Sequence, residues 1–300
     1  MSTTKTLIQQ LQLCDKKALA RCITVVENEL DGYEEILTSL KFNSNIPVVG
    51  VTGPPGAGKS TLINSVIKKL TEENKSVGII AIDPTSPFNY GSLLGDRLRM
   101  AEHFTNENVF IRSLATRGSL GGLSAKTIEI VDVMRAFAFD YIFVETVGVG
   151  QSEVEVVGLA DTTVLVLVPE SGDDVQAIKS GIMEIADIFV VNKSDRDGAN
   201  TFIKNIIQLV HSKVASEWNI PVIKGIATKG EGVDELIAAI DKHNKVGVNT
   251  KRSYLLAEKA YRLIQNTKMK GVSKQDLQKQ IDEELKKKDF NLYTFVRGEK

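Results

Sequence analysis

The sequence predicts an α/β protein with a doubly wound, mostly parallel sheet and helical extensions at both ends. Short apolar runs alternate with stretches of helical spacing through the middle of the chain, which is the pattern of such a sheet. The first run leads directly into a glycine-rich turn and then into a helix. With 42% hydrophobic and 25% charged residues among 300, the composition is that of an ordinary globular protein, and the length suits one large domain with additions.

The apolar runs and the helical spacing give the order of the expected elements. Strands are expected at Ile46–Thr52, Val77–Asp83, Val109–Ser113, Tyr141–Val147, Thr163–Pro169, Ile188–Asn192 and Pro221–Ile226. Helices between them are expected to begin near Lys59, Leu93, Ala125, Asp174, Gly198 and Val233. The first strand has the continuous apolar composition of a buried parallel strand.

Helical regions precede and follow this central part. Residues 1–43 have the spacing of two or three helices and end in a polar break, and residues 246–300 form a charged tail with helical spacing. A tail of this kind would not make a core alone, so we expect it to pack on the central domain or on a second subunit. We therefore expect a helical extension at 1–43, an α/β domain at 44–245 and a helical arm at 246–300.

Charge and hydropathy exclude several classes of partner. A formal net charge of −1 gives no global attraction to nucleic acid or to an anionic membrane surface. No apolar stretch approaches the ~20 residues of a membrane span. Because helical spacing already begins at Leu7 and no signal-peptide core precedes it, we expect a cytoplasmic protein with little room for a cleaved targeting peptide.

Cysteine and histidine usage predicts no metal cluster. Cys14 and Cys22 are the two cysteines, and they are best interpreted as partly buried thiols in a reducing compartment. The three histidines are scattered along the chain, and each is more simply a surface or packing residue than a ligand.

The glycine-rich turn has the spacing of a phosphate-binding loop. It consists of Gly53, Pro54, Pro55, Gly56, Ala57, Gly58, Lys59, Ser60 and Thr61, and it lies between an apolar strand and a helix. Its glycines let successive backbone N–H groups point at one anion, and the helix start adds its dipole. We expect Lys59 to neutralise the β- and γ-phosphates and the Ser60 hydroxyl to ligate Mg²⁺. The stretch predicts a nucleoside triphosphate site.

A second motif predicts which base is bound. The strand that begins at Ile188 runs into Asn192, Lys193, Ser194 and Asp195. A carboxylate at Asp195 can accept two parallel hydrogen bonds from guanine, and adenine offers no such pair, so GTP is favoured over ATP. Asn192 can tie this loop to the phosphate loop, and the Lys193 stem can lie along the base. The loop at Ala227 and Thr228 could donate a backbone N–H to the guanine carbonyl.

Acidic residues at strand ends are the candidate metal ligands. Glu145 follows the apolar run from Tyr141, where it can hold Mg²⁺ or its water shell, and Gly148 would let its N–H approach the γ-phosphate. Asp83 closes the second strand, and Asp96 lies in a glycine-bearing loop. From spacing alone, each of these two is a metal ligand or a cap or turn residue.

Together these stretches resemble a known family, the MeaB, MMAA and ArgK-like GTPase chaperones of adenosylcobalamin-dependent methylmalonyl-CoA mutase, which have also been described as arginine/ornithine transport kinases. The matching segments are Cys14–Glu27, Gly53–Thr61, Asp83–Phe88, Gly95–Met100, Thr116–Leu123, Glu145–Glu153 and Asn192–Asp195. They span most of residues 14–240, so a chance match is not a serious alternative.

The resemblance implies roles that spacing alone does not. It implies GTP and GDP as ligands with Mg²⁺, and it places the metal-site acids on Asp83, Asp96 and Glu145. A third switch segment, which couples the nucleotide to the mutase, falls on Glu170–Lys179, with Asp173 and Lys179 as its charged positions. The resemblance also implies a homodimer and, as partner, an adenosylcobalamin-dependent acyl-CoA mutase, with methylmalonyl-CoA mutase as the first candidate.

The expected reaction is attack of water on the γ-phosphate of GTP, with hydrolysis acting as a timer for cofactor delivery, protection or reactivation of the mutase. Three other functions remain open. A nickel-insertion GTPase would need Cys and His ligands, which are scarce here. A kinase acting on an amino acid or a transport protein would need an acceptor pocket, and a pure scaffold would bind GTP without turnover.

Overall fold

The computed structural model describes residues 3–41, 46–83, 100–115, 125–146, 158–172, 186–211, 218–269, 271–286 and 289–298. Its elements, in chain order, are α1 (Thr3–Gln12), α2 (Lys16–Glu27), α3 (Tyr33–Ser39), β1 (Val48–Thr52), α4 (Lys59–Glu72), β2 (Val77–Asp83), η1 (Ala101–His103), β3 (Val109–Ala115), α6 (Ala125–Arg135), β4 (Tyr141–Glu145), β5 (Thr162–Leu167), η3 (Pro169–Gly172), β6 (Ile188–Val191), α10 (Ala199–His211), β7 (Val222–Lys224), η4 (Ala227–Lys229), α11 (Val233–Met269), α12 (Lys274–Glu284) and α13 (Leu292–Gly298). The chain divides into two compact units, Met1–Ala257 and Glu258–Lys300.

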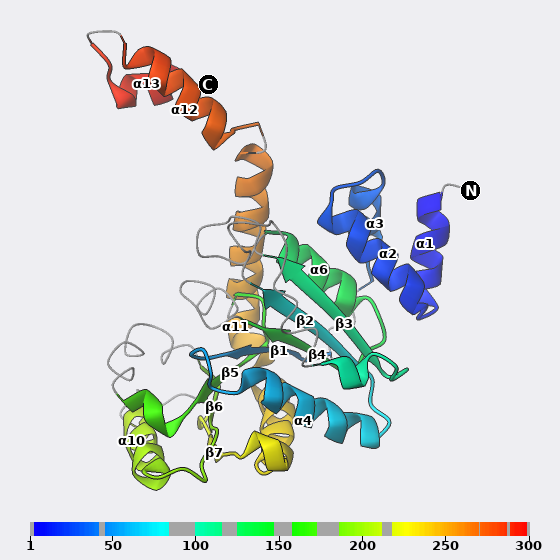
Figure 1. Ribbon diagram of the computed structural model, residues 1–300. Coiled ribbons are helices and arrows are strands. Elements are labelled where there is room, and N and C mark those ends of the chain that lie inside the picture. Colours follow the sequence, from blue (N-terminus) through cyan, green and yellow to red (C-terminus); the bar gives the residue numbers. More distant parts are fainter. Residues whose placement is uncertain are drawn as a thin grey trace. The chain divides into compact units, whose positions relative to one another are not determined.

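The described strands form one seven-stranded parallel sheet in the order β3-β2-β4-β1-β5-β6-β7. This confirms the predicted fold class, and each expected strand is present with its ends shifted by at most two residues. Strand β1 lies between β4 and β5, so the chain leaves it on one side and later continues on the other. In sheets of this kind, ligands bind at the carboxyl ends of the strands where the order reverses. A ligand site is therefore expected at the carboxyl end of β1 (Figure 1).

Helices cover both faces of the sheet, because neighbouring residues of each buried strand point to opposite sides. Val48 and Ile80 pack in one core cluster with α1, α2, α3 and α6, whereas Val49 and Ile79 pack in another with α4 and the start of α11. A third cluster joins α10 to β5 and β6. Figure 1 shows the amino-terminal helices beside α6.

The amino-terminal helices are fastened to the sheet by ion pairs as well as by apolar packing. Asp15 caps α2 by accepting from the Lys17 amide at 2.7 Å. Glu27, at the end of α2, pairs with Arg112 of β3, and Lys126 of α6 pairs with Glu29 at 2.9 Å. These contacts place α1–α3 against β3 and α6, away from the phosphate loop.

Helix α11 is 37 residues long and continues through residue 245, the expected end of the α/β domain. Its first turns are buried through Val233, Leu236 and Ile240, and the division between the two compact units lies further on, after Ala257. The helices expected near Leu93 and Asp174 lie outside the described residues. No helix in the described part of the chain is both long and apolar enough to cross a bilayer.

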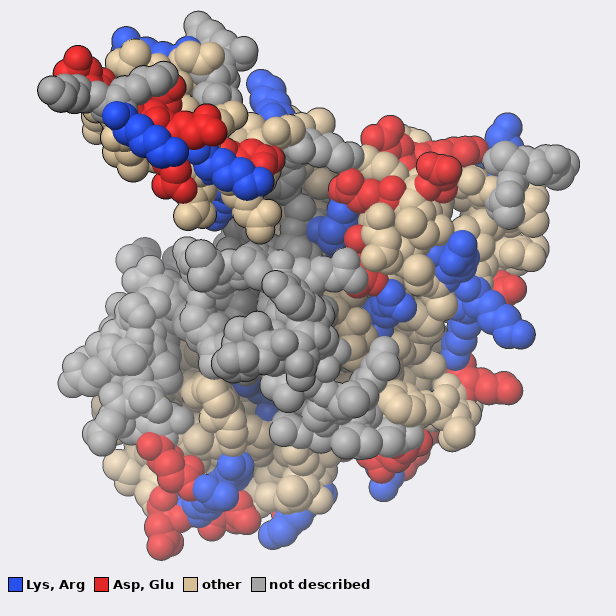
Figure 2. Space-filling model, turned by 45° about the horizontal axis from the view of Figure 1, so that its top comes forward, with Lys and Arg blue, Asp and Glu red and all other residues tan. Residues whose placement is uncertain are grey.

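The surface carries both signs of charge. On the face shown in Figure 2, Lys and Arg side chains are interspersed with Asp and Glu. This distribution agrees with the near-zero net charge of the chain.

Candidate functional site

The phosphate loop connects the end of β1 to the start of α4, as the sequence predicts. Gly53 and Gly58 have φ values of 141° and 85°. A Cβ at Gly53 would lie 2.1 Å from the carbonyl oxygen of Val166, and one at Gly58 would lie 2.4 Å from Nδ2 of Asn192. Both positions therefore require glycine, for conformation and for space. The loop passes directly beside β5 and beside Asn192 of the segment Asn192–Asp195, which is called the base loop below.

Lys59 and Ser60 begin α4, and both are buried. Lys59 Nζ donates to the carbonyl oxygens of Gly53 at 2.8 Å and Pro54 at 3.2 Å, so the ammonium lies against the concave side of the loop backbone. Ser60 Oγ donates to Oε1 of Glu145 at 2.6 Å. The sheet register explains this contact, because Glu145 ends β4 and pairs with Val51 of β1.

The Ser60–Glu145 pair has the chemistry of a Mg²⁺ site. A hydroxyl and a carboxylate are hard oxygen ligands, and they lie side by side at the phosphate loop. Asp83 ends β2, two residues beyond the register partner of Glu145, and so lies at the same edge of the sheet. Among the described side chains, no group of three or more His, Cys, Asp or Glu could hold a metal. The expected ligand Asp96 and the expected γ-phosphate contact Gly148 lie outside the described residues.

Asn192 joins the base loop to the phosphate loop, as the sequence analysis anticipated. Its Nδ2 donates to the carbonyl of Ala57 at 2.8 Å, and its Oδ1 accepts from the amide of Ala227 at 3.0 Å. The side chain is 2% exposed, so these bonds form in a dry environment. Lys193, in a left-handed conformation, donates to the carbonyl of Gly56 at 2.8 Å. The two loops are thus fixed to each other.

Asp195, the residue expected to bind the base, is exposed. Ser194, just before it, is buried, and its hydroxyl lies 2.6 Å from the carbonyl oxygen of Gly225 and 2.9 Å from that of Val191. Ser194 therefore anchors the turn from beneath. This leaves Asp195 at the surface of the site.

Of the backbone amides of Ala227 and Thr228 in the η4 loop, only one is available to donate to a base. The Ala227 N–H is already bonded to Asn192, and the Lys229 N–H to the carbonyl of Ile226 at 2.9 Å. Within the part of the chain that the structure describes, the Thr228 amide donates to no acceptor. Of the two residues that the sequence suggested, Thr228 is therefore the available donor.

The base loop also contacts the start of the expected third switch segment. Arg196 forms an ion pair with Glu170 of η3, and this hydrogen bond holds the pKa of the Glu170 carboxyl below its ordinary value. Both side chains are half exposed, so the pair contributes little to stability. The expected switch residues Asp173 and Lys179 lie outside the described residues.

Two further contacts at this edge, one buried and one partly buried, were missed by the sequence analysis. The Ser65 hydroxyl, on α4, donates to the carbonyl of Ala227 at 2.6 Å. The Thr146 hydroxyl lies 3.2 Å from that of Thr52 and so links the end of β4 to β1. Neither contact has a local sequence signal, because each partner comes from a distant part of the chain.

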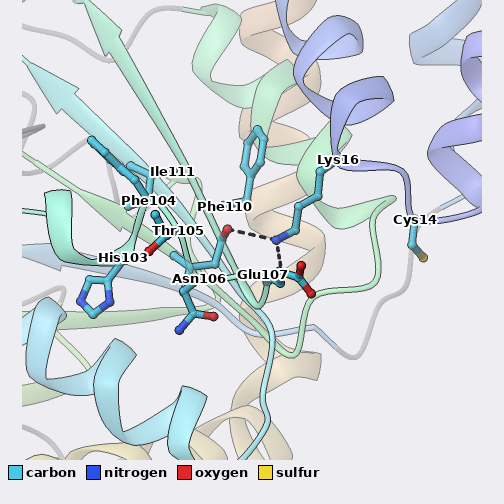
Figure 3. Close-up of a pocket in the computed structure, with 10 residues that line it drawn as sticks. Cys14, Lys16, His103, Phe104, Thr105, Asn106, Glu107, Phe110 and Ile111 are labelled. Atoms are coloured by element: carbon cyan, nitrogen blue, oxygen red, sulfur yellow. Dashed lines mark hydrogen bonds between the residues drawn. The ribbon is translucent and has the colours of Figure 1, made fainter.

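A pocket of about 670 Å³ lies at the junction between the amino-terminal helices and β3 (Figure 3). Lys16 reaches across it to the carbonyls of Glu107 and Val109, the latter at 3.1 Å, and burial lowers the pKa of its amine. Burial also lowers the pKa of His103, which lines the pocket. Because Val109 begins β3 whereas the phosphate loop follows the end of β1, the pocket and the loop lie at opposite edges of the parallel sheet.

Comparisons with known proteins agree with this geometry. The family model described as methylmalonyl-CoA mutase-associated GTPase MeaB matches residues 19–284. The Pyrococcus horikoshii protein PH0274 is 52% identical over 244 residues, which are 80% of this chain and 77% of that protein. The GTPase ArgK of Escherichia coli is 32% identical over 297 residues, 95% of this chain and 87% of its own.

Among solved structures, one described as a LAO/AO transport system kinase superposes with a TM-score of 0.71 at 25% identity, and the match covers 99% of this chain and 96% of that one. The family match covers most of the residues that build the sheet and its loops. The chain is a GTPase, and it belongs to the MeaB family of methylmalonyl-CoA mutase-associated GTPases.

Proposed function

We propose that this chain is a GTP-hydrolysing switch protein that assists an adenosylcobalamin-dependent acyl-CoA mutase, with methylmalonyl-CoA mutase as the expected client. The observation that carries the proposal is the bridge made by Asn192, which fixes a base loop to a phosphate loop in a chain of this family. A nucleotide bound by both loops would span the bridge. Its base and its phosphates would then affect one connected set of backbone atoms.

In this proposal, the nucleotide binds along the carboxyl edge of the sheet. The amides of residues 53–61 surround the phosphates, and Lys59 exchanges its contacts with loop carbonyls for the β- and γ-phosphate oxygens. Asp195 accepts from the guanine ring N–H and amino group, and Lys193 lies along the base. The Thr228 N–H donates to the guanine carbonyl.

Mg²⁺ would be held by Ser60 and Glu145, directly or through water, with Asp83 and Asp96 completing the ligand set. The hydrogen bond between Ser60 and Glu145 shows that these oxygens already lie together. When bound, Mg²⁺ would supply positive charge across the β- and γ-phosphates. Because the Ser60 hydroxyl already donates its hydrogen to Glu145, its oxygen lone pairs would be available to the metal.

The reaction is in-line attack of water on the γ-phosphorus, with cleavage of its bond to the β–γ bridging oxygen, to give GDP and phosphate. Lys59 stabilises the charge that accumulates on the phosphate oxygens, and the loop amides hold the β-phosphate in place. The Gly148 amide is our candidate donor to the γ-phosphate. Enzymes of this type are slow alone, and a partner can complete their site.

Coupling to the mutase is assigned to the segment Glu170–Lys179, with Asp173 and Lys179 as its charged positions. The ion pair between Arg196 and Glu170 supports this assignment, because it connects the base loop to the first residue of the segment. Loss of the γ-phosphate would change the conformation of the segment and so the affinity for the mutase. This step would gate delivery or replacement of adenosylcobalamin.

We also propose a homodimer. The unit Glu258–Lys300 exposes large apolar side chains, among them Tyr261, Ile264 and Tyr293, which a second copy of the arm could cover. Light scattering on the purified full-length chain tests this directly. A monomeric mass at micromolar concentration would refute it.

The experiment that tests the proposed function is GTP turnover with and without an adenosylcobalamin-dependent acyl-CoA mutase from the same source. ATP serves as the nucleotide control, and an unrelated CoA-dependent enzyme as the protein control. We expect the mutase alone to stimulate turnover, with the γ-phosphate label released as free phosphate. Turnover that no mutase alters would refute the chaperone function, and label transferred to an amino acid or protein would identify a kinase instead.

A further inference from the structure

Ser65 lies on α4, on the helical turn after the phosphate-loop residues, and contacts a segment 162 positions away in sequence. Its hydroxyl is 2.6 Å from the carbonyl oxygen of Ala227 and 3.2 Å from that of Thr61. A serine hydroxyl has one hydrogen to donate, and the shorter and non-local contact is the stronger of the two. The Ser65 hydroxyl therefore donates to the η4 loop rather than to a carbonyl of its own helix.

Ala227 is held from both sides as a result. Its N–H donates to Oδ1 of Asn192, whose Nδ2 in turn holds the carbonyl of Ala57. Its C=O accepts from Ser65. Phosphate loop, base loop and η4 thus meet at one residue, which is 3% exposed.

The carbonyl of Ala227 and the amide of Thr228 belong to the same peptide unit. This unit is planar, and it is trans, because the described residues contain no cis peptide bond. Its N–H therefore points opposite to its C=O. A hydrogen bond that fixes the carbonyl toward α4 also fixes the direction of the Thr228 N–H, away from α4.

We infer that Ser65 is a positioning residue for guanine specificity, which orients the Thr228 amide toward the exocyclic carbonyl of the base. The inference rests on the proposed guanine site and adds a residue that does not touch the nucleotide. Without the Ser65 hydroxyl, the Ala227 carbonyl keeps only the 3.2 Å hydrogen bond from the Gly230 amide. The peptide would then be held less firmly, and one base contact would weaken. The contacts that Asp195 makes at the other edge of the base would remain.

Guanine analogues can separate these two edges of the base. In 6-thioguanosine diphosphate, sulfur, a weak acceptor, replaces the carbonyl oxygen, so this analogue reports on the Thr228 amide. Inosine diphosphate lacks the amino group and so reports on Asp195. Calorimetry gives the dissociation constants of GDP and both analogues. The ratio of the 6-thioguanosine diphosphate constant to that of GDP is called the thio penalty, and the ratio of the inosine diphosphate constant to that of GDP is called the inosine penalty.

We expect the wild type to bind 6-thioguanosine diphosphate about tenfold more weakly than GDP, the value of one neutral hydrogen bond. In Ser65→Ala, GDP should bind several-fold more weakly and the thio penalty should fall to about twofold. The inosine penalty should not change. Ser65→Thr, which keeps the hydroxyl, should restore the wild-type pattern.

Thr71→Ala is the matched control, because Thr71 lies on the same helix and donates to the carbonyl of Lys68 at 3.0 Å. It should leave both penalties unchanged. If Ser65→Ala does not fold, the isosteric pair Ser65→Thr and Ser65→Val provides the same comparison. Circular dichroism checks the fold of each variant.

A thio penalty that Ser65→Ala leaves unchanged, or one that is absent from the wild type, would overturn the inference and leave the guanine site in place. If Ser65→Ala lowers the affinity for all three ligands by the same factor, the inference is also overturned. Ser65 would then stabilise the fold of the site without affecting its specificity for guanine. If the wild type shows no inosine penalty, the proposed guanine site itself is wrong.

Discussion

The two edges of the parallel sheet carry polar side chains of similar kinds, but their partners differ. At the carboxyl edge, Lys59 and Lys193 bond to carbonyl oxygens of the phosphate loop. At the amino edge, Asp187 accepts from the Thr163 amide at 2.9 Å and faces His243 of α11, whose Nδ1 lies 2.8 Å from the Thr162 hydroxyl.

This difference separates function from stability. The two lysines at the carboxyl edge have long, flexible side chains whose ammonium groups donate to carbonyl oxygens of the loop. A phosphate oxygen can replace those carbonyl oxygens as acceptor with little loss of free energy. The Asp187–His243–Thr162 group is almost fully buried and joins α11 to the starts of β5 and β6. Changes at the carboxyl edge should therefore alter nucleotide chemistry, and changes at the amino edge should alter the free energy of unfolding.

The largest expected effect is that of Lys59→Ala. Removing the ammonium should lower GTP turnover by about 10²–10³-fold, because a preorganised donor to the transferring group is lost. Phosphate release at saturating GTP measures this. Lys69→Ala is the matched control, since Lys69 lies on the same helix and pairs with Asp234 at the surface. A comparable loss in the control would contradict the assignment.

Asp187→Ala should have the next largest effect, which is on the stability of the protein and not on GTP turnover. It leaves the Thr163 amide and His243 without their buried acceptor, so the free energy of unfolding should fall by about 2–4 kcal/mol. Urea denaturation measures the loss. Affinity for GDP should stay within about twofold when measured well below the transition.

Asp195→Ala is the control for Asp187→Ala from the opposite edge. Asp195 is exposed, so its removal should change the free energy of unfolding by less than about 0.5 kcal/mol while it weakens GDP binding. If Asp187→Ala weakens GDP binding as strongly as Asp195→Ala does, the separation of the two edges fails.

Tyr141→Phe should give the smallest effect. The Tyr141 hydroxyl donates to Asp241 of α11 at 2.7 Å, and its loss should cost about 1 kcal/mol. Burial, together with the bond to Asp241, raises the pKa of Tyr141 above its ordinary value. The stabilisation is therefore complete below about pH 10, where an unfolded tyrosine begins to ionise, and declines above it.

Urea midpoints between pH 8 and 11 test the pH dependence. The wild type should lose stability above about pH 10 more steeply than Tyr141→Phe. Parallel curves for the two proteins would refute this role of the hydroxyl.

Local patterns in the sequence were sufficient to predict the sheet and to place the two loops that are expected to bind the nucleotide. The strands are continuous apolar runs because they are buried on both faces, and the loops have short motifs whose spacing is fixed by the ligand. The bridge of Asn192 to the phosphate loop was anticipated for the same reason.

Contacts between distant segments could not be predicted in this way. Ser65 resembles any serine on a helix, and His243 any histidine in a helical stretch, until the fold places Ala227 and Asp187 opposite them. The continuation of α11 through residue 245 was likewise not visible in the sequence, because the change to a more charged composition there does not interrupt the backbone hydrogen bonds of the helix. Tertiary packing decides such features.

The most direct test of the carboxyl-edge site is a comparison of GTP, ATP and XTP turnover by the wild type and Asp195→Asn. The wild type should hydrolyse GTP and discriminate against ATP and XTP. In Asp195→Asn the preference should move to XTP, by about 10²-fold, because an amide pairs with the xanthine carbonyl and no longer with the guanine amino group. Equal use of GTP and ATP by the wild type, or a variant that keeps its GTP preference, would contradict the account.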